Sequence, residues 1–149
     1  MAEWSNAALQ VVNPGESVIF TNNPVPCRTG LIRHRDDTGS FLLTGYVNAC
    51  SCVKSAEYLC DFGANISIPT EGGTAGTISL AIAIDGNVIA SSEMSVTPAA
   101  VEDPFNVSRA VNVPIWRGCC ETVSVINTSD QPIQVENANI IFTRPDLRR

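Results

Sequence analysis

The stretch YLCDFGANISIP, residues 58–69, decides the fold class because apolar and more polar side chains alternate along it. In a β-strand, successive side chains point to opposite faces of the sheet. The more apolar face would be formed by Tyr58, Cys60, Phe62, Ala64, Ile66 and Ile68. The opposite face would be formed by Leu59, Asp61, Gly63, Asn65 and Ser67. The stretch therefore predicts a long strand with one buried face.

A second alternating stretch, TISLAIAI at residues 77–84, follows the turn-rich segment TEGGTAG. One face carries large apolar residues, and the other carries the small residues Thr77, Ser79, Ala81 and Ala83. These small side chains permit close packing between sheets or between subunits. Asp85-Gly86 then favours a tight hairpin, because glycine adopts positive φ at little cost. The returning strand is predicted over residues 87–98.

The rest of the chain also indicates strands, since no long window repeats apolar residues at helical spacing. Shorter strands are predicted at residues 17–21, 30–34, 40–47, 105–116, 121–127 and 132–143. Loops such as NNPVP and NTSDQP separate them. Nine or so strands at this spacing, without a long linker, predict a single all-β sandwich or barrel.

The composition restricts the classes of partner. Only 16% of the 149 residues are charged, against a usual share of about 25%, so part of the surface is predicted to be buried in an oligomer. The net charge is −6 and no basic stripe is present, which argues against a nucleic-acid partner. The basic cluster at residues 31–35 is followed by Asp36 and Asp37, and we interpret it as locally compensated charge.

The N-terminal segment MAEWSNAALQVV lacks the basic and apolar regions of a secretory signal. No window approaches 18 consecutive apolar residues, so neither a membrane span nor a membrane partner is predicted. We therefore expect the chain to be made and folded in a cytoplasm. Trp4 is interpreted as part of a frayed terminus, with an anchor for the N-terminal arm on a neighbouring subunit as the alternative.

Four segments occur in an order that carries a family resemblance. They are EYLCDFGANISIP (57–69), GTISLAIAIDGNVIASSEMSV (76–96), NVSRAVNVPIWRGCCETVSVINTS (106–129) and PIQVENANIIFTR (132–144). Their order resembles the C-terminal half of C1q/TNF-like jelly-roll domains, including bacterial versions that cap collagen-like surface proteins. The pieces NPGESVIF, LIRHR and FLLTGYV resemble small uncharacterised proteins of gut Firmicutes and their phages, which implies a context and no mechanism.

The C1q/TNF resemblance implies an antiparallel double-sheet jelly-roll sandwich of ten strands that assembles as a compact homotrimer. Residues 1–16 would be an N-terminal arm or first strand, residues 17–145 a single jelly-roll domain and residues 146–149 a C-terminal tail. No Gly-X-Y repeat precedes the domain, unlike in collagen-capped members. Another chain, or the segment Met1–Val12, would therefore have to place the trimer on a larger object.

Catalytic and metal motifs are sparse. The single histidine, His34, is not accompanied by a GxSxG, HExxH or glycine-rich phosphate motif, so we expect neither an enzyme nor a cofactor. A Cys27–His34 nucleophile pair is the alternative, but no third orienting group is evident and a structural histidine at a strand end is favoured. The pairs Cys50/Cys52 and Cys119/Cys120 lack the spacing of structural zinc sites, and we predict no metal.

The six cysteines divide into one core residue and five loop residues. Cys60 falls on the buried face of its strand and is predicted to be a small hydrophobe. The disulfide candidates are Cys27, Cys50, Cys52, Cys119 and Cys120. We expect the CSC loop (50–52) and the CC corner (119–120) to meet and form at least one bridge in an oxidising exterior. The second cysteine of the corner would pack inward or cross to another subunit.

These observations predict a non-enzymatic structural protein that decorates a larger particle, most simply a bacteriophage capsid or a head fibre. Its partners would be itself, as a homotrimer, and a major capsid or other particle protein. The chain would then be made in the bacterial host cytoplasm and located on the virion. One alternative is a receptor- or glycan-binding tip module. A further alternative is a structural protein of a bacterial spore or cell surface.

Overall fold

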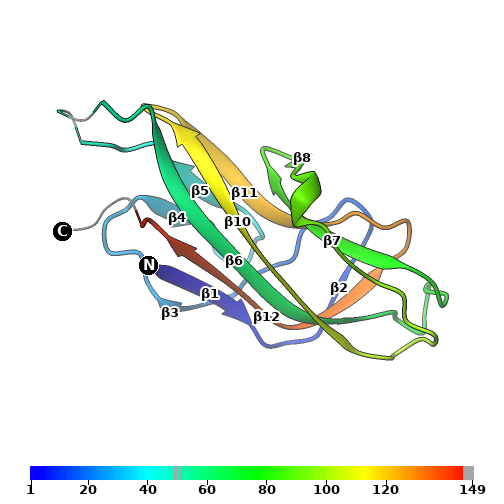
Figure 1. The fold of residues 1–149 in the computed structure, drawn as a ribbon. Helices are drawn as coiled ribbons and strands as arrows, with labels where there is room; N and C mark the ends of the chain where they lie inside the picture. The colour runs from blue at the N-terminus through cyan, green and yellow to red at the C-terminus, as the bar shows by residue number, and fades with distance from the viewer. Residues whose placement is uncertain (49, 51, 146–149) are drawn as a thin grey trace.

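The computed structural model describes residues 1–48, 50 and 52–145, and it places them in two packed antiparallel sheets (Figure 1). The expected tail at residues 146–149 lies outside the described residues. The first sheet, called the β6 sheet, has the order β10-β6-β12-β1-β3, and β2 also pairs with β12. Its strands are β1 (Ala2–Asn6), β2 (Gln10–Val12), β3 (Asn22–Val25), β6 (Ser55–Ser67), β10 (Phe105–Trp116) and β12 (Ile133–Thr143).

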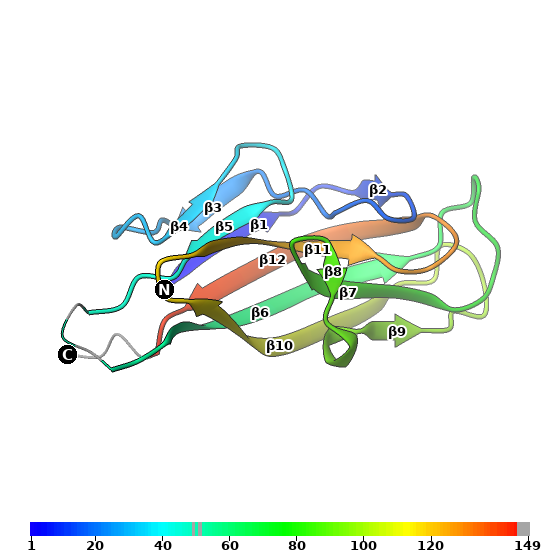
Figure 2. The ribbon, with the colours of Figure 1, turned by 90° about the horizontal axis from the view of Figure 1, so that it is seen from above.

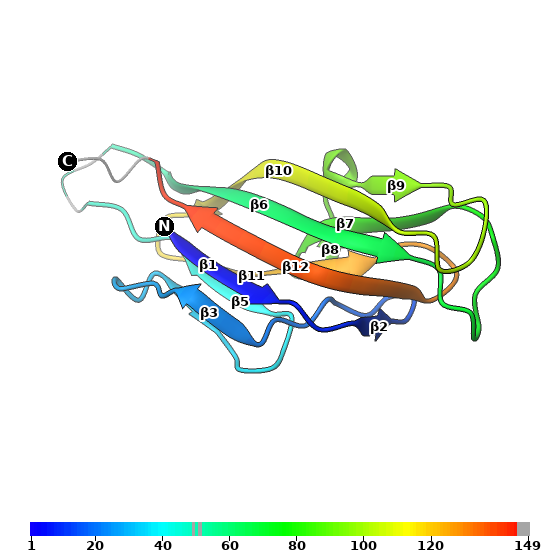
Figure 3. The same cartoon turned by 90° about the horizontal axis from the view of Figure 1, so that it is seen from below.

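The second sheet, called the β11 sheet, has the order β4-β5-β11-β7-β8, and β9 also pairs with β7. Its strands are β4 (Ile32–His34), β5 (Phe41–Thr44), β7 (Ile78–Ile84), β8 (Asn87–Val88), β9 (Met94–Val96) and β11 (Cys120–Asn127). Figure 2 shows the molecule from the side of the β11 sheet, and Figure 3 shows it from the side of the β6 sheet. From β5 to β12 the chain alternates between the two sheets, apart from the β7–β9 segment, as a jelly roll requires.

The alternation in residues 58–69 is confirmed by the burial of β6 and the residue that follows it. All six residues of the predicted apolar face are at most 2% exposed: Tyr58, Cys60, Phe62, Ala64, Ile66 and Ile68. Strand β10 pairs with β6 over its whole length, from Phe105 opposite Ile66 to Trp116 opposite Ser55. The long strand predicted from sequence therefore lies between β10 and β12 and forms one wall of the core.

Aromatic side chains from both sheets meet in the centre of the core. The ring of Phe41, on β5, lies 5.0 Å from the ring of Trp4, on β1, and 5.1 Å from that of Phe142, on β12. Phe20 adds a further edge contact to Phe41, at 5.4 Å. Such edge-to-face pairs add stability beyond the apolar area that they bury. The core therefore depends on a residue only four positions from the start of the chain.

The interpretation of Trp4 as part of a frayed terminus is wrong. Its side chain is only 4% exposed, and β1 pairs with β12 from Ala2 opposite Phe142 to Asn6 opposite Ala138. Residues 1–16 contribute both β1 and β2 to the β6 sheet. The segment NNPVP, expected to be a loop, contains β3, whereas residues 17–21 form only isolated bridges at Ser17 and Phe20.

The hairpin after β7 confirms one prediction and corrects another. Asp85 and Gly86 have φ values of 50° and 82°, as a tight hairpin turn requires. The strand predicted over 87–98 is interrupted: β8 and β9 both pair with β7, and between them the chain forms a short 3-10 helix, η1 (Ala90–Ser92). At the interruption, the buried hydroxyl of Ser92 bonds the backbone N–H and C=O of Ile82.

The small-residue face of β7 is used within the single chain. Ala81 and Ala83 are fully buried and Ser79 is 6% exposed, so this face is covered without a second subunit. Any contact between subunits must therefore use another surface. Among the described residues, no helix is long and apolar enough to cross a membrane.

Candidate functional site

Figure 3 shows the outer face of the β6 sheet turned toward the viewer, with β10, β6, β12 and β1 side by side. We define its central part, made by β6 and β10, as the open face. Its residues are Glu57, Leu59, Asp61, Gly63, Ser108, Ala110, Asn112, Pro114 and Trp116. The register sets Asn112 opposite Leu59 and Ala110 opposite Asp61. The open face is therefore a continuous surface across two long strands.

The open face combines small neutral side chains with exposed apolar ones. Along β10, Ser108, Ala110 and Asn112 are all exposed and uncharged. Trp116 is 63% exposed at the end of the strand, and Leu59 is 37% exposed on β6. Small side chains allow another surface to approach closely, and large exposed apolar side chains gain free energy when they are covered. The open face thus has the composition of a contact surface.

Strand β10 is also an edge of the β6 sheet. It is 12 residues long, and long exposed edge strands are usually blunted by charges, prolines or bulges because they promote association. The only charged residue in β10 is Arg109, and its guanidinium donates to the backbone carbonyl of Glu93, 3.2 Å away. Pro114 interrupts this edge and η1 and β9 contact part of β10, and the rest of the edge carries little charge to oppose association.

At one end of the molecule, two chain crossovers lie side by side. The 45–54 crossover joins β5 to β6, and the turn at residues 117–119 joins β10 to β11. The N–H of Gly45 donates to the carbonyl of Cys119 at 2.7 Å, and the N–H of Arg117 donates to the carbonyl of Lys54 at 2.9 Å. A side chain at Gly45 would overlap the carbonyl oxygen of Trp116. We call this end the crossover pole.

The comparisons with known proteins bear on the fold. No family model matches the chain, and no curated protein matches it in sequence. Among solved structures, a TNF protein, Eiger, from S. frugiperda has a TM-score of 0.65 and 10% identity, covering 96% of this chain and 90% of that one. The globular domain of zebrafish complement 1qA has a TM-score of 0.58 and 12% identity, covering 94% of both chains. The chain has the C1q/TNF-like jelly-roll fold.

The cysteines of this C1q/TNF-like jelly roll gather at the crossover pole. Cys50 and Cys52 lie in the 45–54 crossover, Cys119 lies in the neighbouring turn and Cys120 begins β11. The hydrogen bonds described above join the 117–119 turn to Gly45 and Lys54, which flank the CSC loop, so the meeting of the loop and the corner stays a prediction. All four side chains are exposed, so the expected inward packing of one cysteine of the corner is wrong. All six thiols are unbridged, and the bridge stays a prediction.

Two further thiols lie away from this group. Cys60 is fully buried on β6, and burial, with a smaller effect from the Asp61 carboxylate, raises its pKa to about 12. Burial tends to raise the pKa of Cys27, but hydrogen bonds from the Thr29 hydroxyl and from nearby backbone N–H groups outweigh it and lower that pKa overall. Because the thiolate is the reactive form, Cys27 should react faster than Cys60.

Cys27 and His34 do not form a nucleophile pair in this structure. Both line a cavity of about 200 Å³. However, the thiol of Cys27 is paired with the Thr29 hydroxyl at 3.5 Å. His34 Nε2 lies 2.9 Å from the carbonyl oxygen of Thr38, and its ring stacks on Phe41 at 4.5 Å. His34 therefore supports the turn after β4. The described residues contain no group of three or more histidine, cysteine, aspartate or glutamate side chains placed to hold a metal ion.

The disulfide hypothesis gives the first testable prediction. Protein exposed to oxygen or oxidised glutathione should lose at least one pair of alkylatable thiols, because the hypothesis pairs the exposed Cys50 or Cys52 with the exposed Cys119 or Cys120. Reductant should restore both thiols. The measurement is the mass shift on iodoacetamide labelling, followed by peptide mapping. Cys60 serves as an internal control, since it should label only after denaturation. Six free thiols in oxidised, denatured protein would contradict the hypothesis.

Proposed function

We propose that this chain is a non-enzymatic structural module that assembles as a homotrimer through the open face. The observation that carries the proposal is the open face itself, where a long edge strand with a single charged residue runs beside Leu59 and ends at Trp116. The C1q/TNF-like fold supports the threefold arrangement. In this arrangement the open face of each subunit packs against its neighbours, and Trp116 is covered.

The energetics of such an assembly are favourable because little desolvation of charge is needed on β10. Specific interfaces usually bury about 800 Å² on each partner, with charged residues depleted from the core of the contact. The carboxylates of Glu57 and Asp61 lie on the neighbouring strand β6, where they would form the rim or pair with the partner. The apolar residues Leu59 and Trp116 supply the anchors.

We further propose that the trimer decorates a larger particle, a bacteriophage capsid or a fibre attached to its head. The low share of charged residues and the sparsely charged β10 edge support a protein whose surface is covered by assembly. The partner would be a major capsid protein or another particle protein. The protein would be made in the bacterial host cytoplasm and located on the virion, with a spore or cell surface as the alternative.

Two measurements test the proposal in sequence. Light scattering after size exclusion should give three times the chain mass of 15.9 kDa. Purified trimer should then co-sediment saturably with undecorated phage heads and should not sediment alone. A monomer at micromolar concentration would overturn the homotrimer. A trimer that sediments with spores or cell envelopes, and not with heads, would overturn the capsid role while leaving the assembly intact.

A further inference from the structure

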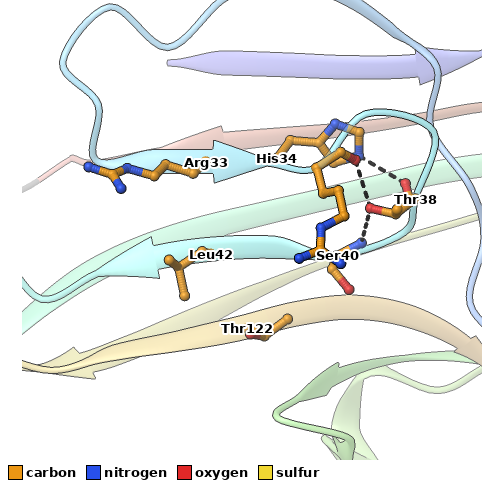
Figure 4. Close-up of a pocket in the computed structure, with 7 residues that line it drawn as sticks. Arg33, His34, Thr38, Ser40, Leu42 and Thr122 are labelled. Carbon is orange, nitrogen blue, oxygen red and sulfur yellow. Dashed lines mark hydrogen bonds between the residues drawn. The ribbon is translucent and has the colours of Figure 1, made fainter.

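A groove on the outer face of the β11 sheet has no role in the proposed assembly. We call it the arginine groove and define it by Arg33, Arg35, Ser40, Leu42 and Thr122 (Figure 4). Its volume is about 610 Å³, within the range of small-molecule sites. It lies on the sheet opposite the open face, so it would remain accessible in the trimer.

The strand register explains how these side chains come together. Leu42, on β5, lies opposite Arg33 of β4 on one side and opposite Thr122 of β11 on the other. The three therefore form one row across the outer face. Arg35, two residues beyond Arg33 and just after the end of β4, lines the same groove, and in Figure 4 the Arg33 side chain extends along β4, away from Ser40. His34, between them, turns inward to stack on Phe41.

In the part of the chain that the structure describes, the positive charge of this groove is not neutralised by ion pairs, although the Asp85 carboxylate accepts a hydrogen bond from the N–H of Thr122 at 2.8 Å. Among the described residues, neither Arg33 nor Arg35 has a carboxylate within ion-pair distance. The adjacent Asp36 lines the cavity beside Cys27, whereas Asp37, with φ of 57°, lines the hollow that adjoins the groove, together with Glu16. In a chain of net charge −6, two arginines that line one hollow and form no ion pair with the described residues raise the local positive potential and favour an anion.

The groove also offers unused hydroxyl groups. Thr38 is occupied, because its hydroxyl donates to the carbonyl of Arg35 and accepts from the N–H of Ser40. Within the described part of the chain, the hydroxyls of Ser40 and Thr122 have no hydrogen-bond partner. Leu42 adds a partly buried apolar surface between the arginines and Thr122. The lining therefore combines cations, hydroxyls and a small apolar patch.

The groove continues beyond the arginines. Thr38 and Ser40 also line the adjoining hollow of about 530 Å³, which extends along the second half of β11 to Ser124 and Ile126. A single inorganic ion would use only the arginine end of this surface. A ligand with an oxyanion at one end and several hydroxyl groups along its length would use both parts.

We propose that the arginine groove binds an acidic saccharide. Arg33 and Arg35 hold its carboxylate, sulfate or phosphate group, because guanidinium donors pair well with oxyanions. Ser40 and Thr122 exchange hydrogen bonds with its hydroxyl groups, and a ring packs on Leu42. The inference goes beyond the proposed assembly and does not depend on it, since a monomer would present the same groove.

The test uses the full chain, sialyllactose as the acidic probe and lactose as its neutral analogue. In isothermal titration or ligand-observed NMR, sialyllactose should bind at least about tenfold more tightly than lactose. Arg33→Gln and Arg35→Gln should each weaken that binding about tenfold, since a charge-assisted hydrogen bond has about this effect. Arg28→Gln removes the same charge from an exposed residue outside the groove and should leave the affinity unchanged.

A second set of measurements distinguishes a site for a saccharide from a site for a bare anion. Thr122→Val removes a hydroxyl with little change of shape and should weaken sialyllactose binding about threefold while leaving sulfate binding unchanged. Far-UV circular dichroism of each variant checks that the fold persists. Equal affinity for sulfate and sialyllactose would leave only an oxyanion site and overturn the saccharide assignment. Binding of the acidic probe that survives the double variant Arg33→Gln/Arg35→Gln would overturn the site.

Discussion

Replacing Ala110 by arginine is expected to convert the trimer to a monomer. Ala110 lies in the middle of the open face, directly opposite Asp61 on β6. In the monomer, the new guanidinium is solvated and can pair with the Asp61 carboxylate, so the fold should tolerate it. In the trimer, the same group would have to be desolvated in a closely packed contact, which costs several kcal/mol. Light scattering should give a mass of 15.9 kDa.

The matched control for this substitution is Ser95→Arg. Ser95 is exposed on β9, an edge strand of the β11 sheet, and it receives the same bulk and charge outside the open face. This variant should remain trimeric and should keep its thermal stability. Ala110→Arg should unfold at a lower temperature than the parent, because subunit association no longer stabilises the native chain. If Ala110→Arg remained trimeric at micromolar concentration, the open face would not be the contact.

The sequence predicted the long strands well because their side chains carry the periodicity of a sheet with one buried face. For β10, the predicted and observed bounds coincide at Phe105–Trp116, and β12 differs from its prediction by one residue. These strands are long enough for alternation to be distinguished from chance, and turn residues mark their ends. The all-β class follows from them, whereas the jelly-roll arrangement was implied by the C1q/TNF resemblance.

The first three strands could not be found in this way. They have three to five residues each, too few for a period to be recognised, and β1 mixes Trp4 with charged and polar neighbours. What holds β1 in place is its pairing with β12, at the other end of the chain. A contact between residues so far apart in sequence leaves no pattern in a short window of the sequence. The interpretation of Trp4 as part of a frayed terminus therefore failed because β12, the pairing partner of β1, is remote in sequence.

The arginine groove was missed for a related reason. The sequence shows Arg33 and Arg35 beside Asp36 and Asp37, which by composition alone indicates compensated charge. The turn at residues 35–38 directs Asp36 to the cavity beside Cys27 and Asp37 to the hollow next to the groove, and strand pairing adds Thr122 from a distant part of the chain. By contrast, the alternating pattern put Cys60 on the buried face of its strand without any need for tertiary information.

The second large effect is expected at Trp4, where replacement by alanine should lower the free energy of unfolding by about 3–5 kcal/mol. The indole is 4% exposed and contacts the rings of Phe41 and Phe142, so its loss leaves a cavity between the two sheets. Because a domain of this size is stable by only about 5–15 kcal/mol, this one change removes a large part of the total. Urea unfolding followed by circular dichroism measures the loss.

Two variants in the same N-terminal segment separate packing from other effects. Leu9 is 55% exposed, and its replacement by alanine should change the free energy of unfolding by less than about 0.5 kcal/mol. Trp4→Phe keeps an aromatic ring against Phe41 and should recover part of the loss seen with alanine. All variants are compared at one protein concentration, because association contributes to the stability of each. Equal, small losses for Trp4→Ala and Leu9→Ala would mean that β1 is not part of the core. A large loss restricted to Trp4 would show that the first residues close the jelly roll by joining its first strand to its last.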